Sequence, residues 1–165
     1  MISIGVDPGK AGGLSILISS WSDRTLSSVY VHPMPMAGDL VDSRLFCRLI
    51  TDKLSDFRSD EAYAYVEKVS SMPGQGVRSM FSFGRSYGIV LGVLGAIGIP
   101  TNLVTPSAWK KVVLEGTDKS KKAAIEYCRR VYPDVNLVLD GCRVPHDGMA
   151  DALAIADYGL RKMRE

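Results

Sequence analysis

The chain has 165 residues, of which 46% are apolar, and its formal net charge is +2. This length and composition indicate one compact domain spanning residues 1–165 with a sizeable core, and they exclude a disordered protein. The near-neutral charge does not by itself indicate a nucleic-acid-binding protein, and the longest apolar stretch, Ile89 to Ile99, is about half of what a membrane span needs.

The first part of the chain predicts a meander of strands, then a helix and a further strand. Short apolar runs rich in β-branched residues predict the strands, and Asp7-Pro8-Gly9 ends the first of them. In chain order we expect strands at Met1–Val6, Leu14–Ser19 and Ser27–His32, a loop at Pro33–Gly38, a helix from Asp42 to Phe57 and a strand at Ala62–Val66. The first two strands are expected to form a hairpin.

The second part predicts alternating helices and strands. After a loop at Ser70–Gly76, the segment Val77–Gly98 is apolar and rich in small residues, which predicts a largely buried helix despite its five glycines. We then expect a strand at Ile99–Val104, a short helix from Thr105-Pro106 through Trp109, an amphipathic helix at Ser120–Val131 and a last helix from Gly148 to about Lys162. This order predicts an α/β fold with a mixed five-stranded sheet and helices on both faces.

The three cysteines, Cys47, Cys128 and Cys142, have no paired spacing, so neither a disulfide framework nor a zinc site is expected. Cys47 and Cys128 fall in helical stretches and are interpreted as small core residues. Free thiols are typical of a reducing compartment, and no secretory signal opens the chain. We therefore expect a bacterial or phage-infected cytoplasm, or an organelle matrix if a transit peptide has been removed.

Carboxylates occur at four places where a fold of this class could gather them. Asp7 and Glu67 follow the first and fourth strands, and open α/β sheets place their sites at the carboxyl ends of strands. Asp147 and Asp151 are four residues apart at the start of the last helix, which puts them on one face. Each position also has an ordinary interpretation, as a solubilising strand end or a partner of the helix dipole.

Several carboxylates at one point would repel each other without a cation. Mg²⁺ or Mn²⁺ prefers carboxylate and water oxygens, and two such ions about 4 Å apart can activate a water molecule and stabilise the leaving oxygen of a phosphodiester. His146, which directly precedes Asp147, could be a metal ligand, a general base or a hydrogen-bond partner of a carboxylate. His32 is interpreted as structural or exposed.

Basic residues are concentrated after the last predicted strand. Residues 109–130 carry seven Lys or Arg against three Asp or Glu, whereas residues 1–108 carry nine of each sign. Such a segment is compatible with phosphate binding, and equally with a solvated helix face.

Three acidic motifs and three intervening blocks, taken together, resemble RuvC-type Holliday junction resolvases over nearly the whole chain. The acidic motifs are Ile4-Gly5-Val6-Asp7-Pro8-Gly9, Tyr65-Val66-Glu67 and His146-Asp147-Gly148-Met149-Ala150-Asp151-Ala152-Leu153. The intervening blocks, Met72–Gly76, Phe83–Gly88 and Val104–Lys110, are similar to the phage and plastid branch of that family.

This resemblance implies an RNase H-like fold and a homodimer that nicks a four-way DNA junction symmetrically, with Mg²⁺ or Mn²⁺, two ions per site, and no small-molecule cofactor. It assigns Asp7, Glu67, Asp147 and Asp151 as metal ligands. Typical bacterial members place the last two ligands three residues apart, where this chain has Gly148. The four-residue spacing is similar to the phage and plastid branch, and whether His146 or Asp147 is the closer ligand stays open.

The same resemblance suggests residues that contact DNA. In the family, the segment matching Gln75 to Tyr87 lies near the junction centre, so Phe81 or Phe83 could wedge between bases, Gln75 could read a base edge and Arg85 could contact the DNA. The alternative is that these aromatic side chains pack in the core or a dimer interface.

Basic residues near the metals are a further feature of related resolvases. Lys119, preferred over Lys121, could stabilise charge on the reacting phosphate, whereas both could also belong to a solvated turn. Lys110 and Lys111 are expected to contact phosphates, and Trp109 is interpreted as packing.

Two other functions stay open on the same scaffold. One is a nuclease acting on RNA–DNA hybrids, flaps or forks, and the other is a junction-binding protein without catalysis. A sugar-kinase-like ATPase is excluded, because the chain is too short for two domains and lacks the phosphate-binding loops.

Overall fold

The computed structural model describes residues 1–23, 25–55, 61–68 and 76–165. In chain order the elements are β1 (Ile2–Asp7), β2 (Gly13–Ser19), β3 (Leu26–Pro33), β4 (Met36–Ala37), β5 (Leu40–Val41), α1 (Ser43–Leu54), β6 (Ala62–Glu67), α2 (Val77–Ala96), β7 (Thr101–Val104), α3 (Pro106–Val113), α4 (Lys121–Val131) and α5 (Asp147–Met163).

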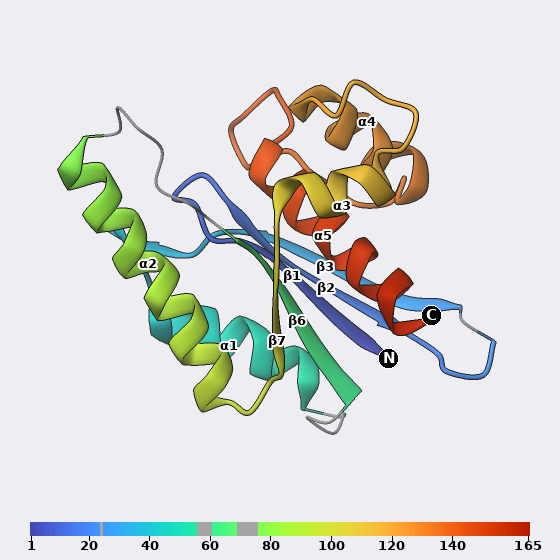
Figure 1. Ribbon diagram of the computed structural model, residues 1–165, viewed down its shortest axis with the longest axis horizontal. Helices are drawn as coiled ribbons and strands as arrows, with labels where there is room; N and C mark the ends of the chain where they lie inside the picture. Colours follow the sequence, from blue (N-terminus) through green and yellow to red (C-terminus); the bar gives the residue numbers. More distant parts are fainter. Residues whose placement is uncertain (24, 56–60, 69–75) are drawn as a thin grey trace.

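A five-stranded sheet in the order β3-β2-β1-β6-β7 forms the centre of the molecule (Figure 1). β2 runs antiparallel to β1 and β3, whereas β1, β6 and β7 are parallel neighbours. The predicted hairpin and the predicted mixed sheet of five strands are therefore confirmed.

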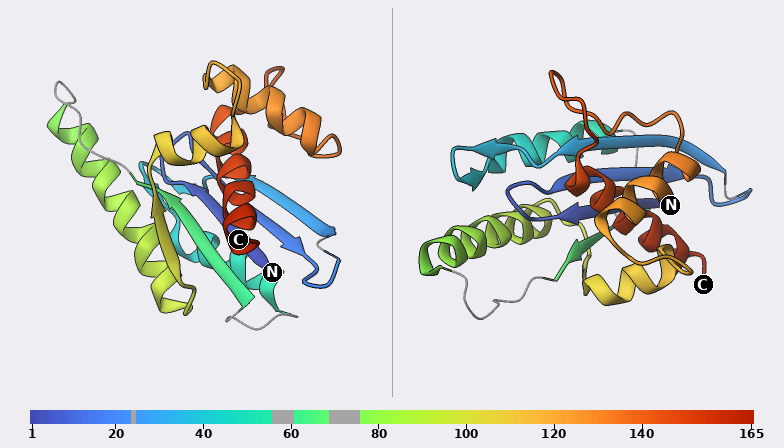
Figure 2. Two further views of the ribbon diagram at one scale, coloured as in Figure 1. Left: turned by 45° about the vertical axis from the view of Figure 1, so that its right-hand side comes forward. Right: turned by 90° about the horizontal axis from the view of Figure 1, so that it is seen from above.

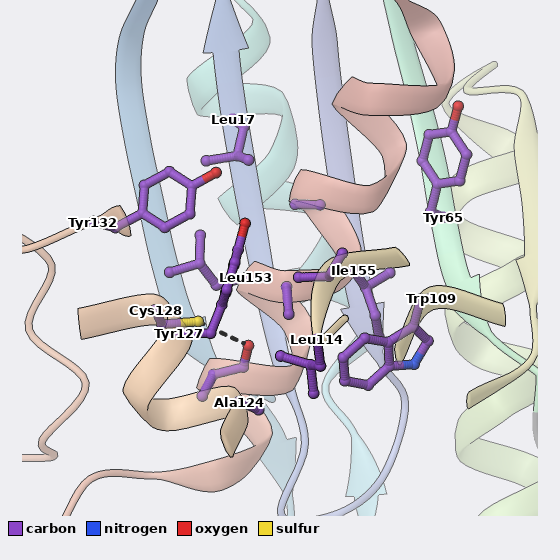
Figure 3. Packing of buried hydrophobic residues seen from close by; sticks show 14 of the residues in the cluster. Leu17, Tyr65, Trp109, Leu114, Ala124, Tyr127, Cys128, Tyr132, Leu153 and Ile155 are labelled. Atoms are coloured by element: carbon purple, nitrogen blue, oxygen red, sulfur yellow. Dashed lines mark hydrogen bonds between the residues drawn. The ribbon is translucent and has the colours of Figure 1, made fainter. Parts of the chain in front are cut away.

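Helices cover both faces of this sheet, as predicted, and each face has its own apolar core. The core beneath α1 and α2 includes Ile2, Ile4, Val6, Ala64, Phe46, Ile50, Val90 and Leu94. The opposite core, shared by α3, α4 and α5, includes Leu17, Tyr65, Trp109, Leu114, Tyr127, Cys128, Leu153 and Ile155 (Figure 3). The two lists follow the period-two alternation of the strands, because successive side chains point to opposite faces.

Helix α5 packs unusually close to β1, and the small residues on that face of the strand explain why. A Cβ atom on Gly5 would lie 2.1 Å from the backbone oxygen of Ala152, so only glycine fits there. Ser3 Oγ, two residues earlier on the same face, donates a hydrogen bond of 2.7 Å to the Ala156 backbone oxygen. These contacts fix α5 along β1, which determines where the first turn of α5 lies relative to the end of the strand.

Helix α4 is held against α5 by a buried polar network. Asp157 on α5 accepts hydrogen bonds from the hydroxyls of Tyr127 (2.6 Å) and Tyr132 (2.7 Å) and from Arg161 Nε (2.9 Å). Arg161 also donates to the Tyr127 hydroxyl at 2.8 Å. Asp157 is buried, with only 9% of its surface exposed. The three donors compensate the negative charge that would otherwise be costly to bury.

Side-chain caps explain where several helices begin. Asp42, Thr105 and Ser120 each accept a hydrogen bond from the backbone N–H three residues later, at the starts of α1, α3 and α4. The predicted cap at Thr105 is confirmed, but α3 continues to Val113 instead of ending at Trp109.

Two sequence predictions about local structure were wrong. The stretch predicted as a loop at Pro33–Gly38 contains β4, which pairs with β5 in a small hairpin. Helix α2 is not largely buried, since only Ser86, Val90 and Leu94 of its described residues are, and Val77 and Phe81 are 85% and 67% exposed. The first turns of α2 project away from the sheet in each view (Figures 1 and 2).

All three cysteines are unpaired thiols, with Cys128 buried, Cys47 half-buried and Cys142 exposed. The core prediction therefore holds for Cys128 and only in part for Cys47. Within the ranges that the structure describes, none of the helices has the length and apolar character required to cross a bilayer.

Candidate active site

Asp7 and Glu67 are the last residues of two neighbouring parallel strands. Val6 of β1 is paired with Val66 of β6, so the two carboxylates follow at equivalent positions on the same edge of the sheet. Both belong to the face that carries α5, because they continue the alternation of Gly5 and Tyr65. The prediction that Asp7 and Glu67 lie at the carboxyl ends of sheet strands is therefore confirmed.

The first turn of α5 lies over this edge. A Cβ atom on Gly148 would lie 2.0 Å from the backbone oxygen of Ala11, so the helix start is packed directly on the turn that follows Asp7. Asp147 and Asp151, one helical turn apart, are consequently held beside the two strand ends.

Asp7 is half-buried, and its Oδ1 atom accepts a hydrogen bond of 3.1 Å from the backbone N–H of Gly9. Burial raises the pKa of this carboxyl, the Gly9 hydrogen bond opposes the shift, and the charge of Asp147 adds to it. The turn after β1 therefore both orients the carboxylate and places it near a second negative charge.

Glu67 receives a hydrogen bond from a buried indole. Trp109 Nε1 donates to Glu67 Oε1 at 2.8 Å, and the Trp109 side chain is fully buried at the start of α3. Burial raises the pKa of Glu67, while the indole N–H lowers it and the charge of Asp7 raises it again. Trp109 is thus the packing residue that the sequence predicted and also a direct partner of a candidate ligand, a role that was not predicted.

Asp151 carries the clearest electrostatic sign of a carboxylate cluster. Its Oδ1 atom is buried without a hydrogen-bond partner in the part of the chain described by the structure. Burial, followed by the charge of Asp7, raises its pKa to about 7, with smaller contributions from Glu67 and Asp147. Asp151 is thus close enough to Asp7, Glu67 and Asp147 for their charges to affect its protonation.

Asp147 differs from the other three because a lysine neutralises it. Lys121 Nζ, at the start of α4, donates a hydrogen bond to Asp147 Oδ2, and this contact lowers the pKa of Asp147 and raises that of Lys121. Lys119, which sequence reasoning preferred, precedes the helix in a left-handed conformation with a φ of 58°, and its backbone N–H donates to Thr117 Oγ1. The lysine that contacts the acidic cluster is therefore Lys121.

His146 caps α5. Its Nδ1 atom accepts a hydrogen bond of 3.2 Å from the backbone N–H of Met149, which fixes the ring at the start of the helix. This contact gives the residue a structural role without deciding whether His146 or Asp147 is the closer metal ligand.

The residue types at this edge suit a hard divalent cation. They offer carboxylate oxygens from three elements, including the partnerless Oδ1 of Asp151, and carboxylates are the ligands that Mg²⁺ and Mn²⁺ prefer. In the conformations that the described side chains adopt, however, no group of three or more His, Cys, Asp and Glu is arranged to hold one ion. The positions fit a metal, and the side chains would have to turn toward it.

The predicted DNA-contacting residues fall into three groups. Gln75 lies outside the described residues. On α2, Phe81 is exposed, Phe83 is half-buried, and the Arg85 guanidinium lies 5.6 Å from the Phe81 ring centroid. On α3, Lys110 Nζ lies 5.2 Å from the Trp109 ring centroid, beside the carboxylates, and Lys111 is exposed.

Comparison with known proteins bears on the fold. No protein-family model matches the chain, and no curated protein matches its sequence. Solved structures do match. RuvC from Thermus thermophilus is 20% identical with a TM-score of 0.63, covering 99% of this chain and 96% of that one. RuvC from the same organism in complex with a Holliday junction substrate is 19% identical with a TM-score of 0.61, at the same coverage.

The yeast mitochondrial Holliday junction resolvase Ydc2 is 15% identical with a TM-score of 0.55, over 96% of this chain and 77% of that one. At these identities the likeness shows the fold, so the RNase H-like fold expected from the sequence is confirmed. The resemblance to RuvC-type resolvases holds at that level, and similarity to the phage and plastid branch stays a prediction.

Proposed function

We propose that this protein is a divalent-metal-dependent endonuclease that resolves four-way DNA junctions by nicking two strands symmetrically. The observation that carries the proposal is the convergence of Asp7, Glu67, Asp147 and Asp151, from β1, β6 and α5, at one edge of an RNase H-like sheet. The solved structures of similar fold include RuvC bound to a Holliday junction substrate and a yeast junction resolvase.

Asp7, Glu67, Asp147 and Asp151 would hold Mg²⁺ or Mn²⁺, two ions per site. When bound, such ions lower the pKa of a water molecule and stabilise charge on the leaving oxygen of a phosphodiester. Burial, and to a lesser extent the charges of neighbouring carboxylates, raise the pKa values of Asp7, Glu67 and Asp151. These shifts support the assignment, because a bound cation would stabilise the charged form of each carboxylate.

Other residues of the chain orient this set. Trp109 holds one oxygen of Glu67, which leaves the second oxygen of that carboxylate for a ligand. Lys121 lies against Asp147, from where its ammonium group could also reach a reacting phosphate and stabilise the charge that develops there. The backbone N–H of Gly9 restrains Asp7 in the same way.

We propose a homodimer as the acting form, because a two-fold pair of active sites matches the two-fold symmetry of a four-way junction. The exposed apolar side chains of the first turns of α2, including Val77 and Phe81, are compatible with either a subunit contact or a wedge against bases. Lys110, Lys111, Lys119 and Lys121 would contact phosphates, which position the DNA without reading its sequence.

The test is cleavage of a labelled mobile four-way junction with Mg²⁺ or Mn²⁺, with the nick positions mapped on all four strands. We expect paired nicks at symmetric positions on opposing strands. The variant Asp7→Asn should bind the junction and fail to cut it, whereas Asp140→Asn, which changes an exposed carboxylate outside the cluster, should cut normally.

The same assay separates the alternatives. Preferential cutting of an RNA–DNA hybrid, flap or fork would show that the enzyme is a nuclease with a different substrate. Junction binding without nicking in any metal would show that the protein binds junctions without catalysis. Normal cutting by Asp7→Asn would contradict the proposed active site.

A further inference from the structure

A hollow of about 500 Å³ lies between the turn after β1, the β4–β5 hairpin and the first turns of α2. Its lining includes Lys10, Asp39, Arg78, Ser79, Ser82 and Ser86. Lys10 lies outside the motifs that suggested a function, and Arg78 falls within the Gln75–Tyr87 segment without having been assigned a role there.

The hollow has a fixed position relative to the candidate active site. Lys10 belongs to the turn after β1, which two hydrogen bonds hold in place. The backbone N–H of Gly9 donates to Asp7 Oδ1, and the backbone N–H of Gly12 donates to the Gly9 backbone oxygen at 2.9 Å. The other side of this turn packs against Gly148 at the start of α5. One short rigid segment therefore connects Asp7 to Lys10.

The hollow and the basic start of α4 lie on opposite sides of the carboxylates. Lys121 and Lys110 belong to the helices on the α5 face of the sheet, whereas Lys10 and Arg78 adjoin the β4–β5 hairpin and α2 on the other face. In Figure 1 the turn after β1 and the first turns of α2 are at the same end of the molecule, beyond the sheet edge. A nucleic-acid strand that contacted both the start of α4 and this hollow would therefore pass over the carboxylates.

The chemistry of the lining suits a phosphate group. Asp39 is the single acidic residue of the described lining, and the positive charges of Lys10 and Arg78 lower its pKa. Lys10 Nζ lies 2.6 Å from Asp39 Oδ1. Serine hydroxyls complete the wall, and Ser82 Oγ donates to the Asp39 backbone oxygen at 3.0 Å, which ties the hairpin tip to α2. The set carries one net positive charge and further hydroxyl donors on a preformed surface.

We propose that this hollow binds a backbone phosphate of the nucleic-acid strand that passes through the active site, held by Lys10 and Arg78. The inference rests on the proposed function and adds a second, independent phosphate contact on the side of the carboxylates opposite α4. Asp39 then acts as an intrinsic competitor, because it pairs with Lys10 when no phosphate is bound and repels a phosphate that approaches.

This arrangement predicts effects of opposite sign, which a merely structural role does not. Lys10→Ala and Arg78→Ala should each weaken binding of a four-way junction several-fold, and each should reduce the slope of log Kd against log salt by about one. Asp39→Asn should tighten binding, since it removes a negative charge and releases Lys10.

A matched set of controls exists on α1. Arg48 and Asp52 form an exposed ion pair of the same kind, 3.4 Å long and away from the hollow. Arg48→Ala and Asp52→Asn make the same changes in formal charge as the test variants, so they report the effect of net charge alone.

The experiment measures Kd by fluorescence anisotropy with a labelled four-way junction in Ca²⁺, at several salt concentrations, for the five variants and the unmodified protein, after circular dichroism has verified folding. Weaker binding by Lys10→Ala and Arg78→Ala than by Arg48→Ala, with tighter binding by Asp39→Asn than by Asp52→Asn, supports the site. Equal effects in the two sets would overturn it while leaving the proposed function intact. Failure of the unmodified protein to bind branched DNA would instead overturn the proposed function.

Discussion

Replacing Asp151 with asparagine should stabilise the metal-free protein while it abolishes cleavage. The side chain is partly buried beside Asp7, its Oδ1 atom has no hydrogen-bond partner in the described residues, and its pKa is raised from 3.8 to about 7. Above that pH the folded protein holds a crowded negative charge, which an amide of nearly the same shape would remove.

The size and pH dependence of this effect follow from the raised pKa. Between pH 4 and 7 the folded protein binds a proton at this carboxyl that the unfolded chain has released, so the free energy of unfolding falls as pH rises through this window. Each pKa unit is worth about 1.4 kcal/mol, so we expect Asp151→Asn to raise the free energy of unfolding by about 2 to 4 kcal/mol at pH 8. Below pH 4 the two proteins should be nearly equal.

Urea denaturation in EDTA at pH 4, 6 and 8, followed by circular dichroism, measures this difference. Asp140→Asn is the control, because it removes one exposed carboxylate outside the cluster. Equal stability of Asp151→Asn and the unmodified protein at pH 8, or a gain that does not depend on pH, would refute the electrostatic reasoning.

Three further substitutions test the supporting contacts. Trp109→Phe removes the indole donor from Glu67, and since a hydrogen bond to a charged group is worth about 1.5 to 3 kcal/mol, Mn²⁺ affinity measured by calorimetry should fall about tenfold or more; unchanged affinity would exclude a positioning role. Lys121→Met should lower kcat about 100-fold with a much smaller change in junction Kd, and Lys121→Arg should restore part of the rate; full activity of the methionine variant would remove Lys121 from the mechanism. Asp157→Asn leaves two tyrosine hydroxyls and a guanidinium with a poorer acceptor, so urea unfolding should show a loss of about 3 kcal/mol, and no loss would mean that the network contributes nothing to stability.

The positions of the acidic residues could be predicted because they follow from local rules. An apolar run that stops at Asp7-Pro8-Gly9 marks a strand end, and the four-residue spacing of Asp147 and Asp151 puts both on one helix face. Parallel strands then bring their carboxyl ends to one edge of the sheet, whichever loops connect them.

Other features depended on tertiary contacts that periodicity does not report. Small and apolar residues made α2 resemble a buried helix, but the sheet does not extend beneath its first turns, so Val77 and Phe81 are exposed. That Lys121 and not Lys119 contacts Asp147 depended on the backbone before α4, where Lys119 itself is left-handed and precedes the Ser120 cap, a conformation that the sequence pattern does not report.

The indole contact of Trp109 had a weak signal in the sequence. A buried tryptophan usually finds an acceptor for its N–H, and α3 begins where β7 ends, beside the end of β6. Glu67 was therefore a candidate partner, but no rule of spacing selects it from the other acceptors at that edge.

Metal titration tests most directly whether Asp7, Glu67, Asp147 and Asp151 act as one site. Calorimetry with Mn²⁺ on the unmodified protein and on each of the four single amide variants gives the affinity and the number of ions bound. We expect the unmodified protein to bind Mn²⁺ with two ions per chain, and every one of the four variants to lose affinity or an ion. Binding by Asp7→Asn and Asp151→Asn at the affinity and stoichiometry of the unmodified protein would contradict a shared site.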